Sequence, residues 1–348
     1  MSVLRDRIIQ EIRSDGPIGF DRFMEVALYD PLAGYFSTGN LRSEKGGDFL
    51  TSPEVSPLFG EIIARFVAAE RDRLGEPFTL VEVGGGSGSL LRPLLDCLDV
   101  APRVVAVERS AAARVSIGEV VADVEIVDEM GAVRGVVVAN ELLDNMPAAL
   151  VVRRASGWSE RRVGEAAGGL QLVEVSPRPE VAGWADRYAG PVPEGGQVEV
   201  QLLATEWVRD AVGRLEAGAL LLFDYGEIAE NLEHRRPEGT VRTYRAHHLG
   251  PEPLAEPGAT DITMDVNFSA LMAAVEGSGC EFELLRQDDF LEQWGLVDRQ
   301  RELRSKELEA AREGDSMERL RLRSRVTEAE TLLHPRGLGD FRVLVVRR

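Results

Sequence analysis

The sequence predicts an α/β fold built on a parallel, doubly wound sheet, and two observations carry this prediction. From residue 78 onward, short apolar runs alternate with segments of helical periodicity. This alternation is typical of βαβ units, in which helices connect parallel strands. In addition, the apolar run 79–83 leads directly into the glycine-dense turn 84–88, which an apolar-periodic segment follows. A buried strand, a tight turn and a helix are expected there.

Residues 1–75 are expected to form a mostly helical N-terminal segment. Apolar residues recur at helical spacing over 4–12, and the Asp-Gly-Pro sequence that follows is a helix stop. Ser52 is expected to cap a later helix with Pro53 at its first position. The helices expected in this segment cover residues 4–12, 20–28 and 53–73.

The expected sheet begins after this segment. Its parallel strands are expected at residues 79–83, 103–108, 123–127, 135–140 and 218–224. The helices between or beside them are expected at residues 88–98, 110–119 and 204–216. A long irregular segment reaches to about residue 266. The elements expected after it are a helix at 268–276, a strand near 281–286 and a final strand at 341–346.

Two insertions are expected in the sheet domain. The first, about 148–200, contains three strand-like runs separated by glycine turns, which predicts a β-meander, with a Pro/Gly-rich loop near 177–196. The second, about 288–333, is rich in Glu and Arg at helical spacing, which predicts a solvated helical face rather than a binding patch. We therefore expect an N-terminal segment, 1–75, and one core, 76–348, that carries both insertions.

Composition restricts the possible classes of protein. The formal net charge is −19, and the chain has no strongly basic block, which argues against a nucleic-acid binder. An acidic surface would attract a basic protein substrate. No apolar run approaches the roughly 18 residues of a membrane span. The N-terminal residues predict an acid-containing amphipathic helix, not a signal or transit peptide, which favours a cytoplasmic protein.

The glycine-dense turn is a candidate cradle for a nucleotide cofactor. Its spacing is Gly84-x-Gly86-x-Gly88, and neither a dinucleotide fingerprint nor a phosphate-binding P-loop fits it. Glu82 precedes the glycines, where a carboxylate would repel a pyrophosphate and would hold a cationic amino-acid group. S-adenosylmethionine carries an ammonium and a sulfonium, so it fits this pattern. A purely structural glycine turn is the alternative.

A second acid supports a nucleotide site. Glu108 ends the next expected strand, twenty residues after Gly88. An acid at this position reaches ribose hydroxyls in nucleotide-binding α/β folds. Both S-adenosylmethionine and NAD carry a ribose, so Glu108 does not distinguish them. The alternative is an ordinary solvated residue at a strand end.

Polar residues also follow two later strands. Asn140, Glu141 and Asp144 come directly after one of them, and Asp224 and Tyr225 follow another. The carboxyl ends of parallel strands meet at one edge of a sheet, so we expect these residues near the glycine-dense turn. Two acids there suit a cationic acceptor such as a guanidinium, which carboxylates bind bidentately. The alternative is that Asn140 and Asp144 cap the next helix, and that Asp224 also caps.

Two further segments are candidates for the substrate side. His247 is a candidate general base, although a lone surface histidine more often has no such role. The acid-rich loop that starts with Asp261-Ile262-Thr263 would either close over the substrate or cap a helix.

Several motifs occur together and in order, and they resemble the MidA family, which includes a mitochondrial arginine methyltransferase that assists assembly of respiratory complex I. The motifs are Gly47-Asp48-Phe49-x-Thr51-Ser52-Pro53-Glu54, Phe59-Gly60-Glu61, the glycine-dense turn, Asn140-Glu141-Leu142-Leu143-Asp144, Asp224-Tyr225-Gly226, Gly239-Thr240-x-Arg242-x-Tyr244-Arg245 and Asp261-Ile262-Thr263. The resemblance covers nearly the whole chain. It implies a Rossmann-like class I fold and an S-adenosylmethionine-dependent protein methyltransferase.

The resemblance also implies roles for individual residues. Those implied for the cofactor are Gly84, Gly86, Gly88 and Glu108, with Thr51, Ser52 and Pro53 in a loop that covers it. Those implied for the acceptor side are Asn140, Glu141 and Asp144. The chain departs from the family at three positions: Pro57 stands where many members have Gln, Ser87 where many have Arg, and Asp265 where His is frequent. These departures concern the acceptor more than the cofactor.

The leading hypothesis is therefore methyl transfer to an arginine of a protein substrate, without a bound metal. One alternative is a non-catalytic assembly chaperone that binds a partner through the two insertions, and another is a small-molecule methyltransferase. A dehydrogenase is disfavoured by Ser89 and Glu82. The oligomeric state stays open, with the β-rich insertion as the candidate contact of a homodimer.

Overall fold

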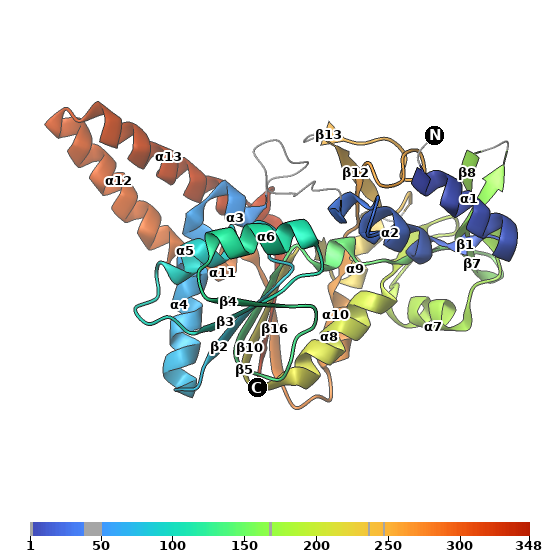
Figure 1. Ribbon diagram of the computed structural model, residues 1–348, viewed down its shortest axis with the longest axis horizontal. Coiled ribbons are helices and arrows are strands. Elements are labelled where there is room, and N and C mark those ends of the chain that lie inside the picture. The colour runs from blue at the N-terminus through green and yellow to red at the C-terminus, as the bar shows by residue number, and fades with distance from the viewer. Residues whose placement is uncertain (1–2, 38–50, 167–168, 236, 246–247) are drawn as a thin grey trace.

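The computed structural model describes residues 3–37, 51–166, 169–235, 237–245 and 248–348. Its centre is a seven-stranded sheet with the order β16-β17-β10-β5-β2-β3-β4, which confirms the predicted α/β class (Figure 1). The parallel strands are β2 (Thr79–Val83), β3 (Arg103–Val107), β4 (Val124–Val127), β5 (Val133–Asn140) and β10 (Leu215–Asp224). The antiparallel pairs join β17 (Arg342–Arg347) to β10 and to β16 (Glu281–Arg286).

The sheet is covered on both faces, as the continuous apolar character of its central strands requires. Successive side chains of a strand point to opposite faces, so Leu80 joins the core on one face and Val81 the core on the other. The helices on the first face include α4 (Pro57–Leu74), α5 (Leu91–Leu95), α6 (Ala111–Val120) and α11 (Gln287–Gln293). Those on the second face are α8 (Leu202–Arg214) and α10 (Phe268–Val275).

Two helices of this part differ from the prediction. The helix expected over 53–73 is split into α3 (Ser52–Val55) and α4, because Ser56 is extended with φ −159° and ψ 136°. Ser56 precedes a proline, which disfavours the helical region for the residue before it. The residue that caps α3 is Thr51, not Ser52. The helix expected over 88–98 shortens to α5, which begins after Gly88, a residue whose φ of +77° is not helical.

A second sheet joins the N-terminal segment to the first insertion. It has the order β1-β7-β6-β9, with β8 paired to β7, so β1 of the N-terminal segment lies at the edge of the insertion's strands. The strands are β1 (Ile18–Gly19), β6 (Ala149–Arg154), β7 (Gly157–Ala166), β8 (Gly169–Val175) and β9 (Gln197–Val200). The predicted meander is confirmed. Helices α1 (Val3–Asp15) and α2 (Phe20–Tyr29) pack on this sheet.

The prediction of a loop near 177–196 is wrong, because helix α7 (Pro179–Tyr188) occupies half of this segment. Proline is well suited to the first position of a helix, where its missing N–H costs nothing. Val181, Trp184 and Ala185 then follow at helical spacing and are buried against the sheet. The segment has turn-forming Pro and Gly residues at both ends, and for this reason the short amphipathic helix was not predicted.

The segment expected to be irregular up to residue 266 contains short strands. They form two small sheets, one from β12 paired with β13 and β14, and one from β11 paired with β15. These strands are β11 (Gly226–Glu227), β12 (Arg242–Arg245), β13 (His248–Leu249), β14 (Asp261–Thr263) and β15 (Val266–Asn267). The remaining short helices are η1 (Tyr35–Ser37), η2 (Leu143–Asn145), α9 (Ala229–Leu232), η3 (Glu233–Arg235) and η4 (Leu338–Asp340).

The second insertion forms a helical hairpin, here called the helical arm, from α12 (Leu296–Glu313) and α13 (Ser316–Leu332). It projects from the end of the molecule opposite the second sheet (Figure 1). Gly314 ends α12 with a φ of +81°, and the side chain of Asp315 caps α13 by accepting the N–H of Glu318. None of the described helices has the length and apolar character needed to cross a membrane.

Candidate functional site

The loops that carry the predicted residues gather at the carboxyl edge of the seven-stranded sheet. Strand β2 lies between β3 and β5, so the chain leaves β2 toward one side of the sheet and later returns to its other side. Such a reversal opens a crevice at the strand ends, where ligands of open α/β sheets bind. The loops after β2, β3, β5 and β10 all leave the sheet at this edge.

The glycine loop, residues 84–88, has a conformation that suits a bound ligand. Gly84, Gly86 and Gly88 have φ values of 72°, 54° and 77°, which residues with a side chain rarely adopt. The N–H of Gly84 donates to the carbonyl of Val107 across 2.9 Å, which fixes the loop against β3. A Cβ added at Gly86 would meet no described atom within 4 Å. The backbone of the loop is therefore open to a ligand at this residue.

Glu82 is a buried acid directly beneath the glycine loop. A Cβ added at Gly85 would lie 2.5 Å from Glu82 Oε2, so the carboxylate faces the loop backbone. Among the described residues, Oε2 has no hydrogen-bond partner. Burial, and secondly the charge of Glu108, raises the pKa of Glu82 to about 8. A cation bound at the loop would offset both effects and favour the charged carboxylate.

Glu108 lies at the end of β3 beside the same loop. Its carboxylate accepts the N–H of Ser110 at 2.8 Å and that of Gly86 at 3.4 Å. The hydroxyl of Ser110 donates to the carbonyl of Phe36 across 2.9 Å, and the guanidinium carbon of Arg109 lies 5.8 Å from the ring centre of Tyr29. The N-terminal segment therefore contacts the end of β3, next to the cradle.

Thr51, Ser52 and Pro53 are buried, and the contacts of this segment are made with α11 and, through Ser56, with the helical arm. The hydroxyl of Ser52 lies within 3.3 Å of the side-chain amide of Gln287, at the start of α11. The nearby Ser56 donates its hydroxyl hydrogen to Glu328 of α13 across 2.7 Å. Cofactor contact by Thr51, Ser52 and Pro53 stays a prediction. His247 lies outside the described residues.

After β5 the backbone turns sharply at Glu141. This residue has a φ of +50°, in the left-handed region that favours glycine, and its N–H donates to the carbonyl of Phe223 across 2.8 Å. A residue with a side chain in this left-handed conformation carries backbone strain on the order of 1–3 kcal/mol, and such strained residues are typical of functional sites. The Nδ2 of Asn140 lies 3.3 Å from Glu141 Oε1. The turn thus sets the Glu141 carboxylate beside the strand end.

Asp224 and Asp144 are fully buried behind this turn. One oxygen of Asp224 accepts the N–H groups of Leu143 and Asp144 at 2.9 and 3.2 Å, and the other accepts that of Tyr225 at 2.9 Å. These bonds agree with the capping alternative for Asp224. The hydroxyl of Tyr225 donates to Asp144 Oδ2 across 2.7 Å. Asp144 therefore reaches the crevice through Tyr225.

A cavity of about 160 Å³ opens at this point, and we call it the strand-end cavity. Of the residues predicted from the sequence, Glu141 and Tyr225 line it. Asp261, Thr263 and Asp265 of the acid-rich loop line it as well. The remaining lining residues, which were assigned no role at the site from the sequence, are Arg235, Arg242, Tyr244 and Phe341. The cavity thus contains three acids, namely Glu141, Asp261 from β14 and Asp265. For the loop that starts with Asp261, the sequence predicts either closure over the substrate or the capping of a helix.

The antiparallel pair of β12 and β14 explains this set. Arg242 faces Thr263 across the pair, and Tyr244 faces Asp261. Alternate residues of a strand share one face, so these four side chains point the same way. Asn145 Nδ2 donates to Asp261 Oδ1 across 2.8 Å and ties the pair to the turn after β5. The alternating polar residues of both strands were a signal in the sequence, but the strands are too short for periodicity to identify.

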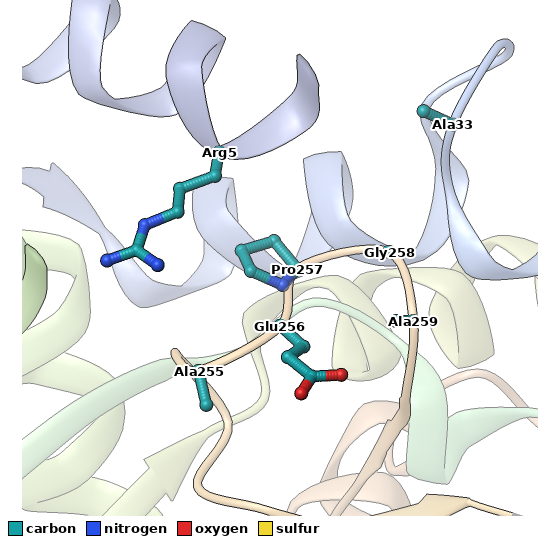
Figure 2. A pocket seen from close by; sticks show the side chains of 7 residues that line it. All are labelled: Arg5, Ala33, Ala255, Glu256, Pro257, Gly258 and Ala259. Atoms are coloured by element: carbon teal, nitrogen blue, oxygen red, sulfur yellow. The ribbon is translucent and has the colours of Figure 1, made fainter. Parts of the chain in front are cut away.

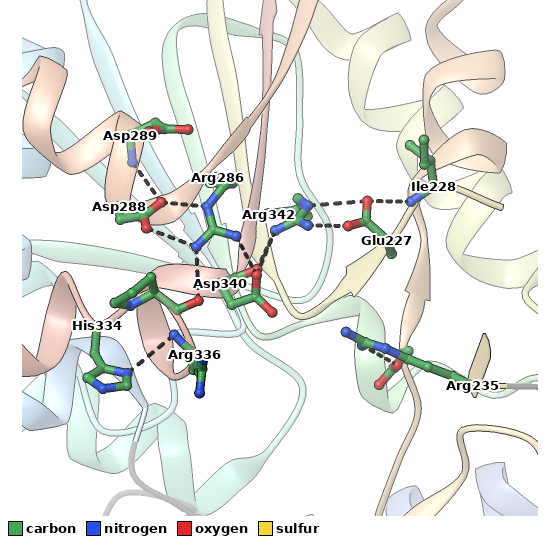
Figure 3. Close-up of polar contacts among 12 residues, drawn as sticks. Glu227, Ile228, Arg235, Arg286, Asp288, Asp289, His334, Arg336, Asp340 and Arg342 are labelled. Atoms are coloured by element: carbon green, nitrogen blue, oxygen red, sulfur yellow. Dashed lines mark hydrogen bonds and ion pairs between the residues drawn. The ribbon is translucent and has the colours of Figure 1, made fainter. Parts of the chain in front are cut away.

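A chain of ion pairs supports the wall of the cavity that Phe341 forms. Figure 3 shows Arg342 between Asp340 and Glu227, and Arg286 between Asp288 and Asp340. Arg286 Nη1 lies 2.6 Å from Asp340 Oδ1. These contacts join η4, β16 and β17 to the segment after β10, where Tyr225 packs with a ring-centre distance of 5.5 Å to Phe341.

A larger cavity, of about 380 Å³, lies elsewhere. It is lined by Arg5 of α1, by Ala33 and by residues 255–259 of one loop (Figure 2). Most of this lining is alanine, proline and glycine, and its acid, Glu256, forms an ion pair with Arg245. Binding sites combine a shaped pocket with convergent polar groups, so the smaller strand-end cavity is the better candidate. The described residues contain no group of acids, histidines and cysteines arranged to hold a metal ion.

Comparisons with known proteins agree with this geometry. Residues 62–285 match the model of the family Methyltransf_28, described as "Putative S-adenosyl-L-methionine-dependent methyltransferase". A crystal structure from Burkholderia thailandensis bound to S-adenosyl-homocysteine has 31% sequence identity and a TM-score of 0.86, and the match covers 99% of this chain and 92% of that one.

Curated relatives are more distant in sequence. The protein arginine methyltransferase NDUFAF7 of Xenopus tropicalis is 25% identical over 85% of this chain and 76% of its own length. The human protein of the same name is 26% identical over 83% of this chain and 72% of its own length.

Proposed function

We propose that this chain, which belongs to the MidA family of S-adenosylmethionine-dependent methyltransferases, methylates an arginine side chain of a protein substrate. The family and the cofactor are established by the comparisons above. The observation that carries the choice of acceptor is the strand-end cavity, in which the carboxylates of Glu141 and Asp261 lie with two tyrosine rings. The third carboxylate of the cavity, Asp265, is already paired with two arginines. The names of the curated relatives support the same acceptor.

The glycine loop fits the cofactor. The open backbone at Gly86 leaves room for it, and the buried Oε2 of Glu82 offers a negative charge for its cationic amino-acid part. Glu108 would accept hydrogen bonds from the ribose hydroxyls in place of the loop N–H groups that it now accepts. When bound, the cofactor supplies an electrophilic methyl group on its sulfonium.

The strand-end cavity fits a guanidinium. Carboxylates bind this planar cation through paired, charge-assisted hydrogen bonds. The rings of Tyr225 and Tyr244 line the same space, and aromatic faces attract cations. Glu141 and Asp261 would orient the guanidinium, and one of them would take the proton that its nitrogen loses as the new N–CH₃ bond forms. Positioning of the two reactants accounts for much of the catalysis of such a transfer.

The experiment is transfer of a tritiated methyl group from S-adenosylmethionine to proteins of a cell lysate, followed by acid hydrolysis and identification of the labelled amino acid. We expect methylarginine. Glu141→Gln and Asp261→Asn should each lower the rate by about a hundredfold, because each removes a charge that positions the acceptor. The matched control is Glu256→Gln, an acid on the loop before β14 that lies outside the strand-end cavity. Label in another amino acid, or in a small molecule, would overturn the proposed acceptor.

A further inference from the structure

We infer that Arg235 and Arg242, both held on Asp265, form a carboxylate-binding subsite beside the acceptor position of the strand-end cavity. The enzyme would then select an arginine that has a carboxylate of the same substrate close to it. This inference rests on the proposed function, because the acceptor arginine defines the neighbouring position.

The first observation is an excess of positive charge. Arg235 Nη1 lies 2.8 Å from Asp265 Oδ2, and Arg242 Nη1 lies 3.3 Å from Asp265 Oδ1. Two guanidiniums against one carboxylate leave a local net charge of +1. Asp340 and Glu227 also act on Arg235, but these two acids form ion pairs with Arg286 and Arg342. One arginine would be enough to neutralise a buried acid, so the second is not needed for that purpose. Both arginines line the cavity.

The second observation is that the two arginines retain donors. In the part of the chain that the structure describes, the guanidinium groups of Arg235 and Arg242 each donate one hydrogen bond, from Nη1 to Asp265. The planar guanidinium has five N–H donors in a fixed fork, which matches a carboxylate. Their side chains are 43% and 40% exposed, whereas that of Asp265 is 1% exposed. The acid is thus a buried anchor, and the cations face outward from it.

The anchor itself is fixed. The backbone N–H of Asp265 donates to the hydroxyl of Thr240 at 3.2 Å, and its carbonyl accepts the side-chain amide of Gln201 at 3.0 Å. Thr240 in turn donates its hydroxyl hydrogen to the buried Glu199 at 3.0 Å. A pre-organised binding group loses little conformational entropy when a ligand arrives, so the two arginines are held ready for an anion.

The third observation is the order of charges along the two short strands. Asp261 faces Tyr244, Arg242 faces Thr263 one step further, and Asp265 follows β14. A step of two residues spans about 7 Å, so the acid that would hold the acceptor lies about 7 Å along the strand from the first arginine. A carboxylate within two residues of a substrate arginine reaches that far. The cavity is therefore negative at one end and positive at the other.

The test uses four short peptides with a fluorescent label and otherwise blocked ends. Two contain Arg-Asp or Arg-Asn within the peptide. The other two end in Arg-Asn, with either a free carboxylate or an amide, and they separate a side-chain carboxylate from a terminal one. Fluorescence anisotropy with S-adenosylhomocysteine present measures peptide affinity without turnover. We expect peptides with a carboxylate next to arginine to bind about tenfold more tightly, and the difference to shrink at high salt.

Arg235→Gln and Arg242→Gln should each remove most of this preference. The matched control is Arg245→Gln, which lies on the same strand as Arg242, is also 40% exposed, and pairs with Glu256. Equal affinity for all peptides, or no measurable binding of any, would overturn the inference. A preference for the carboxylate without formation of methylarginine would instead leave the subsite standing and overturn the proposed function.

Discussion

The hydroxyl of Tyr225 donates a hydrogen bond of 2.7 Å to Oδ2 of Asp144 and so joins the end of strand β10 to the turn that follows β5. Asp144 is fully buried, whereas Tyr225 lines the strand-end cavity. The bond therefore links an acid in the interior to the wall of the acceptor site. Its geometry makes Asp144 a positioning residue for Tyr225.

Tyr225→Phe should slow methyl transfer about tenfold and leave the affinity for S-adenosylmethionine unchanged. The ring would stay, but its hydrogen bond to the buried Asp144 would be lost, which costs about 1–3 kcal/mol, and the ring would be less firmly held. Initial rates and calorimetric titration with the cofactor measure the two effects separately. Tyr188→Phe, on helix α7, is the matched control. A loss of cofactor affinity equal to the loss of rate would contradict this role.

Much of the fold was predictable because its signals are local. The five parallel strands are apolar runs with turn residues at their ends, and the glycine loop follows the first of them directly. The same reasoning placed Glu82, Glu141 and Tyr225 at one edge of the sheet, since parallel strands end together. These residues could be assigned to a common edge without knowledge of the packing.

The second acid proposed to hold the acceptor, Asp261, could not be predicted in this way. The sequence offers Asp144 and Asp261 as candidates, and the choice depends on how β14 pairs with β12, sixteen residues earlier in the chain at its nearest point. Each strand has only three or four residues, which is too short for a periodic signal. Asp265 and its two arginines meet only in the tertiary structure.

Gly86→Val should abolish binding of S-adenosylmethionine while the protein stays folded. The added Cβ would meet no described atom within 4 Å, so it would occupy space that the loop leaves for its ligand. The φ of +54° adds strain of about 1–3 kcal/mol. Gly314→Val at the tip of the helical arm is the matched control, because its φ is +81° and its Cβ would also meet open space. Calorimetric titration checks both variants, and normal affinity in Gly86→Val would show that the cofactor binds elsewhere.

Glu82→Gln should flatten the dependence of stability on pH. The pKa of Glu82 is raised from 4.5 to about 8, so between these values the folded protein keeps a proton that the unfolded chain has released. The contribution of Glu82 to stability therefore falls as the pH rises through this window, by about 1.4 kcal/mol per pH unit. Urea unfolding at pH 5, 6.5 and 8 measures the free energy of unfolding of both proteins.

The exposed Glu119→Gln serves as the control for this series. The same slope in the wild type and in Glu82→Gln would contradict the assignment. The cofactor provides a second test, because its positive charge favours the ionised form of Glu82. Binding near pH 7 should release a proton, which titrations in two buffers of different ionisation enthalpy detect. Glu82→Gln should lose this release.

Glu141→Gly should make the protein more stable and less active at the same time. Glu141 has a φ of +50°, which costs a residue with a side chain on the order of 1 kcal/mol and costs glycine little. The substitution removes this strain together with the carboxylate of the acceptor cavity. We expect the free energy of unfolding to rise by about 1 kcal/mol and methyl transfer to fall at least a hundredfold.

The chain offers a matched control for this prediction. Asp123 has a φ of +57°, lies in an exposed turn before β4 and does not line the strand-end cavity. Asp123→Gly should therefore give a similar gain in stability and leave methyl transfer unchanged. Urea unfolding and initial rates of both variants test the pair. If Glu141→Gly were destabilised while Asp123→Gly was stabilised, the contacts of the Glu141 carboxylate would outweigh the backbone strain. In that case the contacts of the Glu141 carboxylate would stabilise the turn, and the backbone strain would not be explained by catalysis.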